Sequence, residues 1–304
     1  MPSVFNKGTK ILVVLSLLLA GFFVVSCGGS SDSERKTPIR NQVKPDTLSM
    51  IIKFDNSLFP IPSPYQAAAL VKKNGIPFED NLVNSQSNLT KYTTTFKKAL
   101  NLGIYGTDIS YLNIYERTPE TIPYLTVIKK LSEELGLINA FDEKFFASLE
   151  KNMNNRDSLL VQMAQAYRKA DSYLRSNDRK EMGALIITGG WIESLHILCK
   201  LATKSSDREI INRIGEQKYP LDNLIELLTP YYYKEPEYAK LIDAFIDLAY
   251  EFDGIIFNYS YREPRIDVEN KLIQVNSESR VIMSEYHLKT ISNKIELIRN
   301  QIIG

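Results

Sequence analysis

Residues 183–202, GALIITGGWIESLHILCKLA, decide the fold of this chain. Their apolar side chains cover the whole circumference of a helix that we expect to run from Asp178 to about Ala202. A helix without a polar face is usually buried at the centre of a domain. The segment therefore predicts one central helix, in which the thiol of Cys199 is a small buried hydrophobe.

Glycines inside this segment need an explanation, because each Gly destabilises a helix by ~1 kcal/mol relative to Ala. One explanation is that Gly189 and Gly190 let a neighbouring helix approach closely. The alternative is that they break the helix and open a pocket beside Trp191. The continuous apolar pattern favours the first explanation, and the sequence leaves both open.

Outward from this helix, apolar residues recur at helical spacing through most of the chain. The clearest stripes lie in residues 124–135, 160–174, 241–252 and 288–302. Pro236 marks the first turn of one helix and Ser284 caps the last one. Short connections between such helices favour antiparallel neighbours.

One region reads as β-structure. Residues 265–268 and 271–275 alternate around Glu269-Asn270 in the pattern of a hairpin, and residues 280–283 could add a short third strand. We therefore expect a mainly α fold. It is a single, antiparallel, bundle-like helical domain over residues 48–304, with a small β-hairpin or short meander before the C-terminal helix.

Composition excludes several classes of function. With 37 Lys and Arg against 36 Asp and Glu, the chain has no excess of basic residues for nucleic acid. Two cysteines and two histidines are too few for a disulfide scaffold or a His-rich metal centre.

The N-terminus has the features of an export signal. Lys7 and Lys10 precede an apolar run from Ile11 to Val25, which is shorter than the ~20 residues that a spanning helix needs. The run ends at Val24-Val25-Ser26-Cys27, which resembles the lipobox of bacterial lipoproteins. The resemblance implies cleavage after Ser26, so that residues 1–26 are a signal peptide, and attachment of lipid, including palmitate, to Cys27.

Residues 27–47 contain Gly-Gly-Ser-Ser, mixed charges and two prolines, and are too polar to build a core. We expect a lipidated, flexible tether with a reach on the order of 25 Å. In Gram-negative lipoproteins an Asp after the lipidated cysteine favours the inner membrane. Gly28 occupies that position here, so the resemblance implies an outer-membrane protein of the cell envelope, facing either the periplasm or the surface.

Four segments resemble a family of uncharacterised Bacteroidetes lipoproteins. They are residues 59–64 (FPIPSP), 98–108 (KALNLGIYGTD), 155–159 (NRDSL) and 189–193 (GGWIE). The resemblance spans most of the chain after the tether and implies one helical domain. It implies no activity and no catalytic residue.

Candidate site residues are few. Glu193 and His196 share one helix face at the spacing of di-iron bundles, but the second Glu-x-x-His of such a site is absent, so we expect no metal and no cofactor. With Trp191 they would line the pocket of a binding site, if one exists. Asp108 follows the stretch from Gly103 to Gly106 and is expected to cap a helix beginning at Ile109.

Tyrosines 231–233 lie between helices, where some of the rings must be exposed. Exposed rings can bind a peptide, a glycan or a protein partner, although two could equally pack against the core and leave one in solvent.

Nucleotide-binding and serine-hydrolase motifs do not occur in the sequence. The leading hypothesis is a membrane-anchored envelope lipoprotein with a binding or scaffolding domain that is not an enzyme. Its partner would be an envelope protein, a peptide or a glycan. The alternatives are a solute-binding lipoprotein with a pocket near Trp191, and an envelope hydrolase without a recognisable motif.

Overall fold

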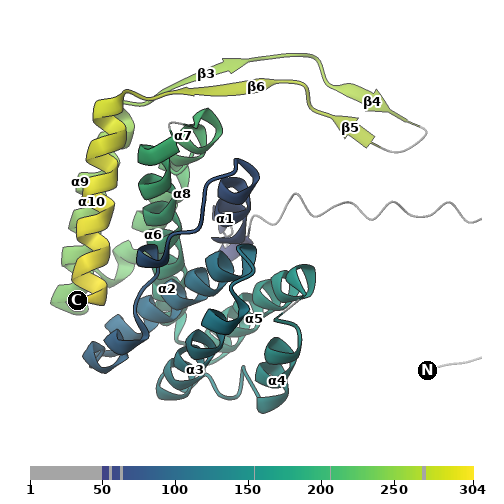
Figure 1. The fold of residues 1–304 in the computed structure, drawn as a ribbon. Coiled ribbons are helices and arrows are strands. Elements are labelled where there is room, and N and C mark those ends of the chain that lie inside the picture. The colour runs from purple at the N-terminus through teal and green to yellow at the C-terminus, as the bar shows by residue number, and fades with distance from the viewer. Residues whose placement is uncertain (1–49, 55–56, 62–63, 154, 206, 269–271) are drawn as a thin grey trace, which may run out of the picture. The chain divides into compact units, whose positions relative to one another are not determined.

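The apolar segment forms a single helix, α6 (Lys180–Ser205), against which most other helices pack (Figure 1). The structure is a computed structural model that describes residues 50–54, 57–61, 64–153, 155–205, 207–268 and 272–304. All of them belong to one compact unit, residues 45–304. The predicted signal peptide and tether, including Cys27, lie outside the described residues.

Helices make up most of this unit, which confirms the predicted fold class. The α-helices besides α6 are α1 (Pro64–Lys73), α2 (Thr95–Ile114), α3 (Thr118–Glu134), α4 (Glu143–Lys151), α5 (Arg156–Ser176), α7 (Arg208–Gly215), α8 (Lys218–Leu228), α9 (Pro236–Asp253) and α10 (Glu285–Ile303). Three short 3-10 helices, η1 (Asp80–Leu82), η2 (Gln86–Lys91) and η3 (Thr229–Tyr231), lie in the connections. The expected helix starts are confirmed at Pro236 and at Ser284, whose hydroxyl accepts a hydrogen bond from the His287 amide.

Helix α6 is buried on all sides, as its sequence predicts. Every residue from Met182 to Cys199 is buried, and the Cys199 thiol is completely enclosed. Within the described residues, α6 is the one helix long and apolar enough to cross a membrane, but its apolar window lies wholly inside the protein. A helix at the centre of a folded domain can be as long and as apolar as a membrane span, and the complete burial of this window agrees with such a place.

The glycines of α6 serve close helix packing. A Cβ atom on Gly189 would lie 1.9 Å from the carbonyl oxygen of Leu100 in α2, and one on Gly103 in α2 would lie 1.9 Å from that of Ile186. Both distances are far below van der Waals contact, so the two backbones cross where neither carries a side chain. Helix α6 runs through Gly189 and Gly190 without a break. The first explanation for the glycines is therefore confirmed.

One sequence prediction about α2 is wrong. Asp108 does not cap a helix that starts at Ile109, because α2 is continuous from Thr95 to Ile114. The actual N-cap is Thr94, whose side chain accepts a hydrogen bond from the Lys97 amide. Asp108 lies in the middle of the helix and is fully buried. The glycines that suggested a loop are the ones that permit the crossing with α6.

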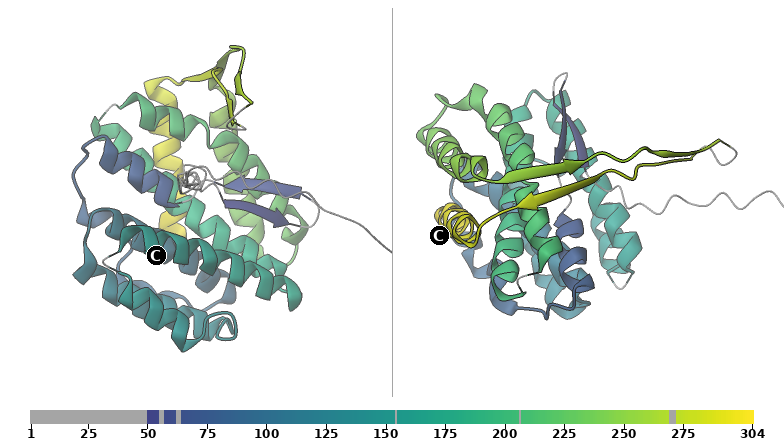
Figure 2. Two further views of the ribbon diagram at one scale, coloured as in Figure 1. Left: turned by 90° about the vertical axis from the view of Figure 1, so that its right-hand side faces the viewer. Right: turned by 90° about the horizontal axis from the view of Figure 1, so that it is seen from above.

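The strands form three antiparallel pairs. The predicted hairpin is confirmed as β4 (Arg265–Asp267) with β5 (Leu272–Gln274). The third strand expected before the last helix is β6 (Glu278–Ile282), and it pairs with β3 (Ile256–Ser260). A further pair, β1 (Met50–Phe54) with β2 (Ser57–Ile61), was not anticipated from the sequence. Figure 1 and the right-hand view of Figure 2 show β3–β6 and β4–β5 following one another as a ribbon that leads away from the helices.

Candidate functional site

The three residues proposed from the sequence all lie on α6, and all are buried. Trp191 donates a hydrogen bond from Nε1 to Oε1 of Gln217 at 3.1 Å. Its ring meets that of Phe245 edge to face, with 5.5 Å between the centroids. Since both its polar atom and its ring face are occupied by protein, Trp191 is a core residue in this structure.

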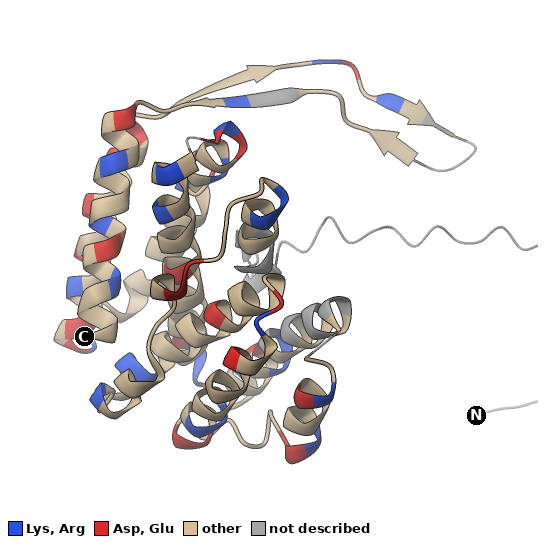
Figure 3. Cartoon of the chain, viewed as in Figure 1, with Lys and Arg blue, Asp and Glu red and all other residues tan. Residues whose placement is uncertain are grey.

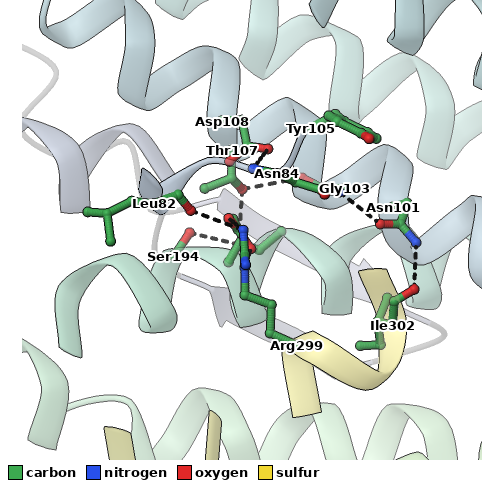
Figure 4. A network of polar contacts seen from close by, with 12 residues as sticks. Leu82, Asn84, Asn101, Gly103, Tyr105, Thr107, Asp108, Ser194, Arg299 and Ile302 are labelled. Carbon is green, nitrogen blue, oxygen red and sulfur yellow. Dashed lines mark hydrogen bonds and ion pairs between the residues drawn. The ribbon is translucent and has the colours of Figure 1, made fainter. Parts of the chain in front are cut away.

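Glu193 is the partner of a charged residue that the sequence analysis did not single out, Arg299 of α10 (Figure 4). Arg299 donates from Nε to Glu193 Oε2 at 2.5 Å and from Nη2 to Oε1 at 2.7 Å. Its Nη2 also donates to the carbonyl oxygen of Leu82 at 3.0 Å. The two parallel bonds form a bidentate ion pair, the geometry in which arginine binds carboxylates most strongly.

Asp108 brings a second carboxyl group to this pair. Its Oδ2 accepts a hydrogen bond from the backbone amide of Asn84 at 3.1 Å. Burial, and then the negative charge of Glu193, raise the pKa of Asp108 well above its ordinary value, although Arg299 opposes the shift. Its other oxygen, Oδ1, faces no donor. A proton on Asp108 removes this conflict, because a carboxylic acid can donate a hydrogen bond to the Glu193 carboxylate.

Neutral side chains extend the cluster into a network that joins α2, α6, α10 and the loop at residues 82–85 (Figure 4). The Asn84 amide donates to the Tyr92 hydroxyl at 2.9 Å and to Asn101 at 3.3 Å. Asn101 donates in turn to the carbonyl oxygen of Ile302 at 3.3 Å. Thr107 of α2 donates to the carbonyl of Gly190 at 3.1 Å, beside the glycine crossing. The network therefore ties together segments that are distant in sequence.

His196 lies one helical turn after Glu193 and is held neutral. Burial lowers its pKa from 6.5 to about 4, while the nearby carboxylates of Glu193 and Glu296 raise it, and Arg299 and Lys200 lower it further. Its Nδ1 is buried without a hydrogen-bond partner among the described residues. Protonating such a buried imidazole therefore costs free energy.

The polar cluster can share a proton between two carboxyl groups and lock three helices in register. Among the residues that the structure describes, no group of three or more His, Cys, Asp or Glu side chains could hold a metal ion. The thiol of Cys199 has its pKa raised strongly by burial, which keeps it protonated and unreactive.

In the part of the chain that the structure describes, three hollows are lined by residues other than Trp191, Glu193 and His196. An apolar cavity of about 50 Å³ lies among α2 to α6. A groove of about 100 Å³ lies between α2, α9 and α10. A larger groove of about 580 Å³ separates α6, α7 and α10. Its lining includes the apolar Ile211, Met283 and Leu288 and the basic Lys200 and Lys289.

Of the three consecutive tyrosines, two pack against the core and one stands in solvent, which is the second interpretation given by the sequence. Tyr231 and Tyr232 are partly buried against the core, and the Tyr232 hydroxyl donates to Asp243 at 3.1 Å. Tyr233 is 95% exposed. A single exposed ring does not make an aromatic patch.

The β4–β5 ribbon carries the most distinctive exposed surface. Its register places Ile266 opposite Ile273, so both point to one face. Val268 and Val275 directly follow the last residues of the two strands. These four residues, the aliphatic face, are exposed by 63% (Ile266), 68% (Ile273), 80% (Val268) and 72% (Val275). In the same register Arg265 lies opposite Gln274, and Leu272, opposite Asp267, is itself 59% exposed.

Comparison with known proteins finds no matching family model, no matching curated protein and no matching solved structure.

Sequence reasoning missed Arg299 and the buried role of Asp108. A signal was present in both cases. Arg299 is one residue after Ile298 in the apolar stripe of the last helix, and Asp108 lies within an otherwise largely apolar stretch. A charged residue at a core position requires a partner, because an unpaired buried charge is very costly.

Proposed function

We propose that this chain is a lipid-anchored cell-envelope protein whose helical domain binds a partner and does not catalyse a reaction. The anchor is proposed from the sequence alone. It rests on the lipobox-like Val24-Val25-Ser26-Cys27 after an apolar run, followed by a polar tether. Gly28 after the cysteine supports the outer membrane as the location.

One observation carries the binding role, namely the uncovered aliphatic face. Four branched apolar side chains of the ribbon, together with Leu272 of β5, stand in solvent. Contiguous exposed apolar surface of this kind is typical of interaction sites. The polar cluster around Glu193 supports a structural role, because its side chains are buried and Arg299 pairs with Glu193 inside the core.

Two measurements test the proposal. Metabolic labelling with palmitate should label the native chain, and Cys27→Ser should abolish the label. A photo-reactive residue in place of Ile273 should form covalent adducts in intact cells, whereas the same residue in place of Gln274, on the opposite face, should form few. Palmitate labelling of Cys27→Ser would refute the anchor, and equal or absent adducts at both positions would refute binding by this face.

A second candidate function is solute binding, which the groove between α6, α7 and α10 favours. Its apolar wall and the ammonium group of Lys289 suit a solute with an apolar body and an anionic head, whereas Lys200 pairs with Glu296 at 2.7 Å. Dodecanoate should then raise the melting temperature of the protein, and Lys289→Glu should reduce that rise. No rise at millimolar dodecanoate would exclude this class of solute.

A further inference from the structure

The buried cluster of Asp108, Glu193 and Arg299 contains more acidic than basic groups. Figure 3 shows basic and acidic residues intermixed over the helices of the protein. In this cluster, however, Asp108 and Glu193 are completely buried and Arg299 is only 6% exposed, so water does not hydrate their charges. If all three side chains were ionised, the core would hold one uncompensated negative charge, which is very costly.

Hydrogen bonds assign the guanidinium to only one of the two carboxyl groups. Arg299 donates to both oxygens of Glu193 and to the carbonyl oxygen of Leu82. Asp108 accepts a hydrogen bond from the backbone amide of Asn84, and its Oδ1 has no donor among the described residues. The carboxyl groups of Asp108 and Glu193 lie within hydrogen-bonding reach of each other. Two carboxylates cannot form a hydrogen bond, whereas a carboxylic acid can donate one to a carboxylate.

The other titratable groups that the structure places around this pair do not supply the missing positive charge. Three phenols lie near Asp108, namely Tyr105 on the same helix, Tyr124 of α3 and Tyr92, which directly follows η2. Burial raises the pKa of all three phenols, so they are neutral at neutral pH. His196 is neutral as well, because burial lowers its pKa to about 4. A proton on Asp108 is therefore the remaining way to balance the cluster.

We propose that this cluster is a pH-sensitive latch, in which one proton held between Asp108 and Glu193 closes the junction of α2, α6 and α10. When the pH rises, the Asp108 carboxyl group gives its proton to solvent. Two carboxylates then face one guanidinium inside the core, and their repulsion weakens the junction. The latch acts within the core, so it is independent of the proposed lipid anchor and of the proposed binding face.

The direction of the pH effect follows from the two states of Asp108. Burial, and then the charge of Glu193, raise its pKa in the folded protein well above the model value of 3.8, whereas unfolding removes both effects. Folding therefore takes up a proton at any pH between these two pKa values. The stability that the latch contributes is complete below about pH 4 and is lost as the pH rises through the pKa of the folded protein.

Comparison of the wild type with Asp108→Asn measures this linkage. The Asn amide has nearly the shape of a carboxylic acid and can make the same two hydrogen bonds, but it has no proton to lose. Urea unfolding of the full chain, followed by circular dichroism between about pH 5 and pH 8, gives the unfolding equilibrium constant of each protein. The constant of the wild type divided by that of Asp108→Asn should rise with pH, by up to about tenfold per pH unit. Asp243→Asn, at an exposed carboxylate of α9, is the matched control and should change this ratio far less. A ratio for Asp108→Asn that does not change with pH would overturn the latch.

Two further measurements separate a shared proton from burial alone. In a Glu193→Gln background, Arg299 can compensate Asp108 instead, so adding Asp108→Asn should change the pH dependence much less. An undiminished pH dependence in that background would overturn the role of the pair. Carbon-13 NMR of the wild type with labelled aspartate does not depend on any variant folding. One Asp carboxyl group should remain neutral at about pH 6, where an unperturbed Asp is ionised, and its signal should be absent from Asp108→Asn. Ionisation of every Asp at that pH would also overturn the proposal.

Discussion

Replacing Arg299 by methionine should remove the positive charge that pairs with the buried Glu193 carboxylate. Arg299→Met loses both bonds to Glu193 and leaves the Leu82 carbonyl oxygen without its donor. Removing one partner of a buried ion pair costs about 3–5 kcal/mol. We expect the free energy of unfolding at neutral pH to fall by that amount.

Urea unfolding of the two proteins, followed by circular dichroism, measures this loss. Lys294→Met is the matched control on the same helix, since Lys294 pairs nearer the surface with Asp247 and Glu251 at 2.9 Å, and it should cost less than about 1 kcal/mol. Glu193→Gln combined with Arg299→Met should recover part of the loss, because neither charge is then buried alone. If Arg299→Met unfolds at the same urea concentration as Lys294→Met, the cluster does not stabilise the fold as argued.

Four further variants test the core. Gly189→Ala should lower the free energy of unfolding by about 3 kcal/mol, because its Cβ would lie 1.9 Å from a backbone oxygen. In the same denaturation assay, Gly183→Ala should be neutral or should stabilise the protein by up to about 1 kcal/mol, because the nearest atom to its Cβ would be 3.7 Å away. Trp191→Ala should cost about 3–5 kcal/mol, and a melting curve like that of the wild type would refute its place in the core. His196 binds its proton more weakly when folded, with a pKa of about 4 against 6.5, so its contribution is present above pH 6.5 and is lost as the pH falls. The stability of the wild type relative to His196→Leu should therefore drop by about 3 kcal/mol between pH 7 and about pH 4, and a constant difference would contradict the buried neutral imidazole.

Local sequence patterns by themselves determine several elements of the fold. The apolar circumference of residues 183–202 was sufficient to predict a central helix, because a helix without a polar face can be accommodated only by burial on all sides. The alternation around Glu269-Asn270 predicted the β4–β5 hairpin, and Ser284 predicted the start of the last helix, because both signals act over a few neighbouring residues. The tether, the lipid anchor and the envelope location stay predictions from the sequence.

Tertiary structure alone decided which of these parts meet. Glu193 and Arg299 are 106 residues apart, and no local spacing relates them. Asp108 was misread because glycines that usually mark a loop here serve the crossing of α2 with α6, a contact that exists only once both helices are packed. The pairing of β3 with β6 spans the whole hairpin between them, so it could not be read from either strand. The sequence determines structure where a residue and its partner lie within one turn or one hairpin, and packing decides wherever the partner must be brought from elsewhere in the chain.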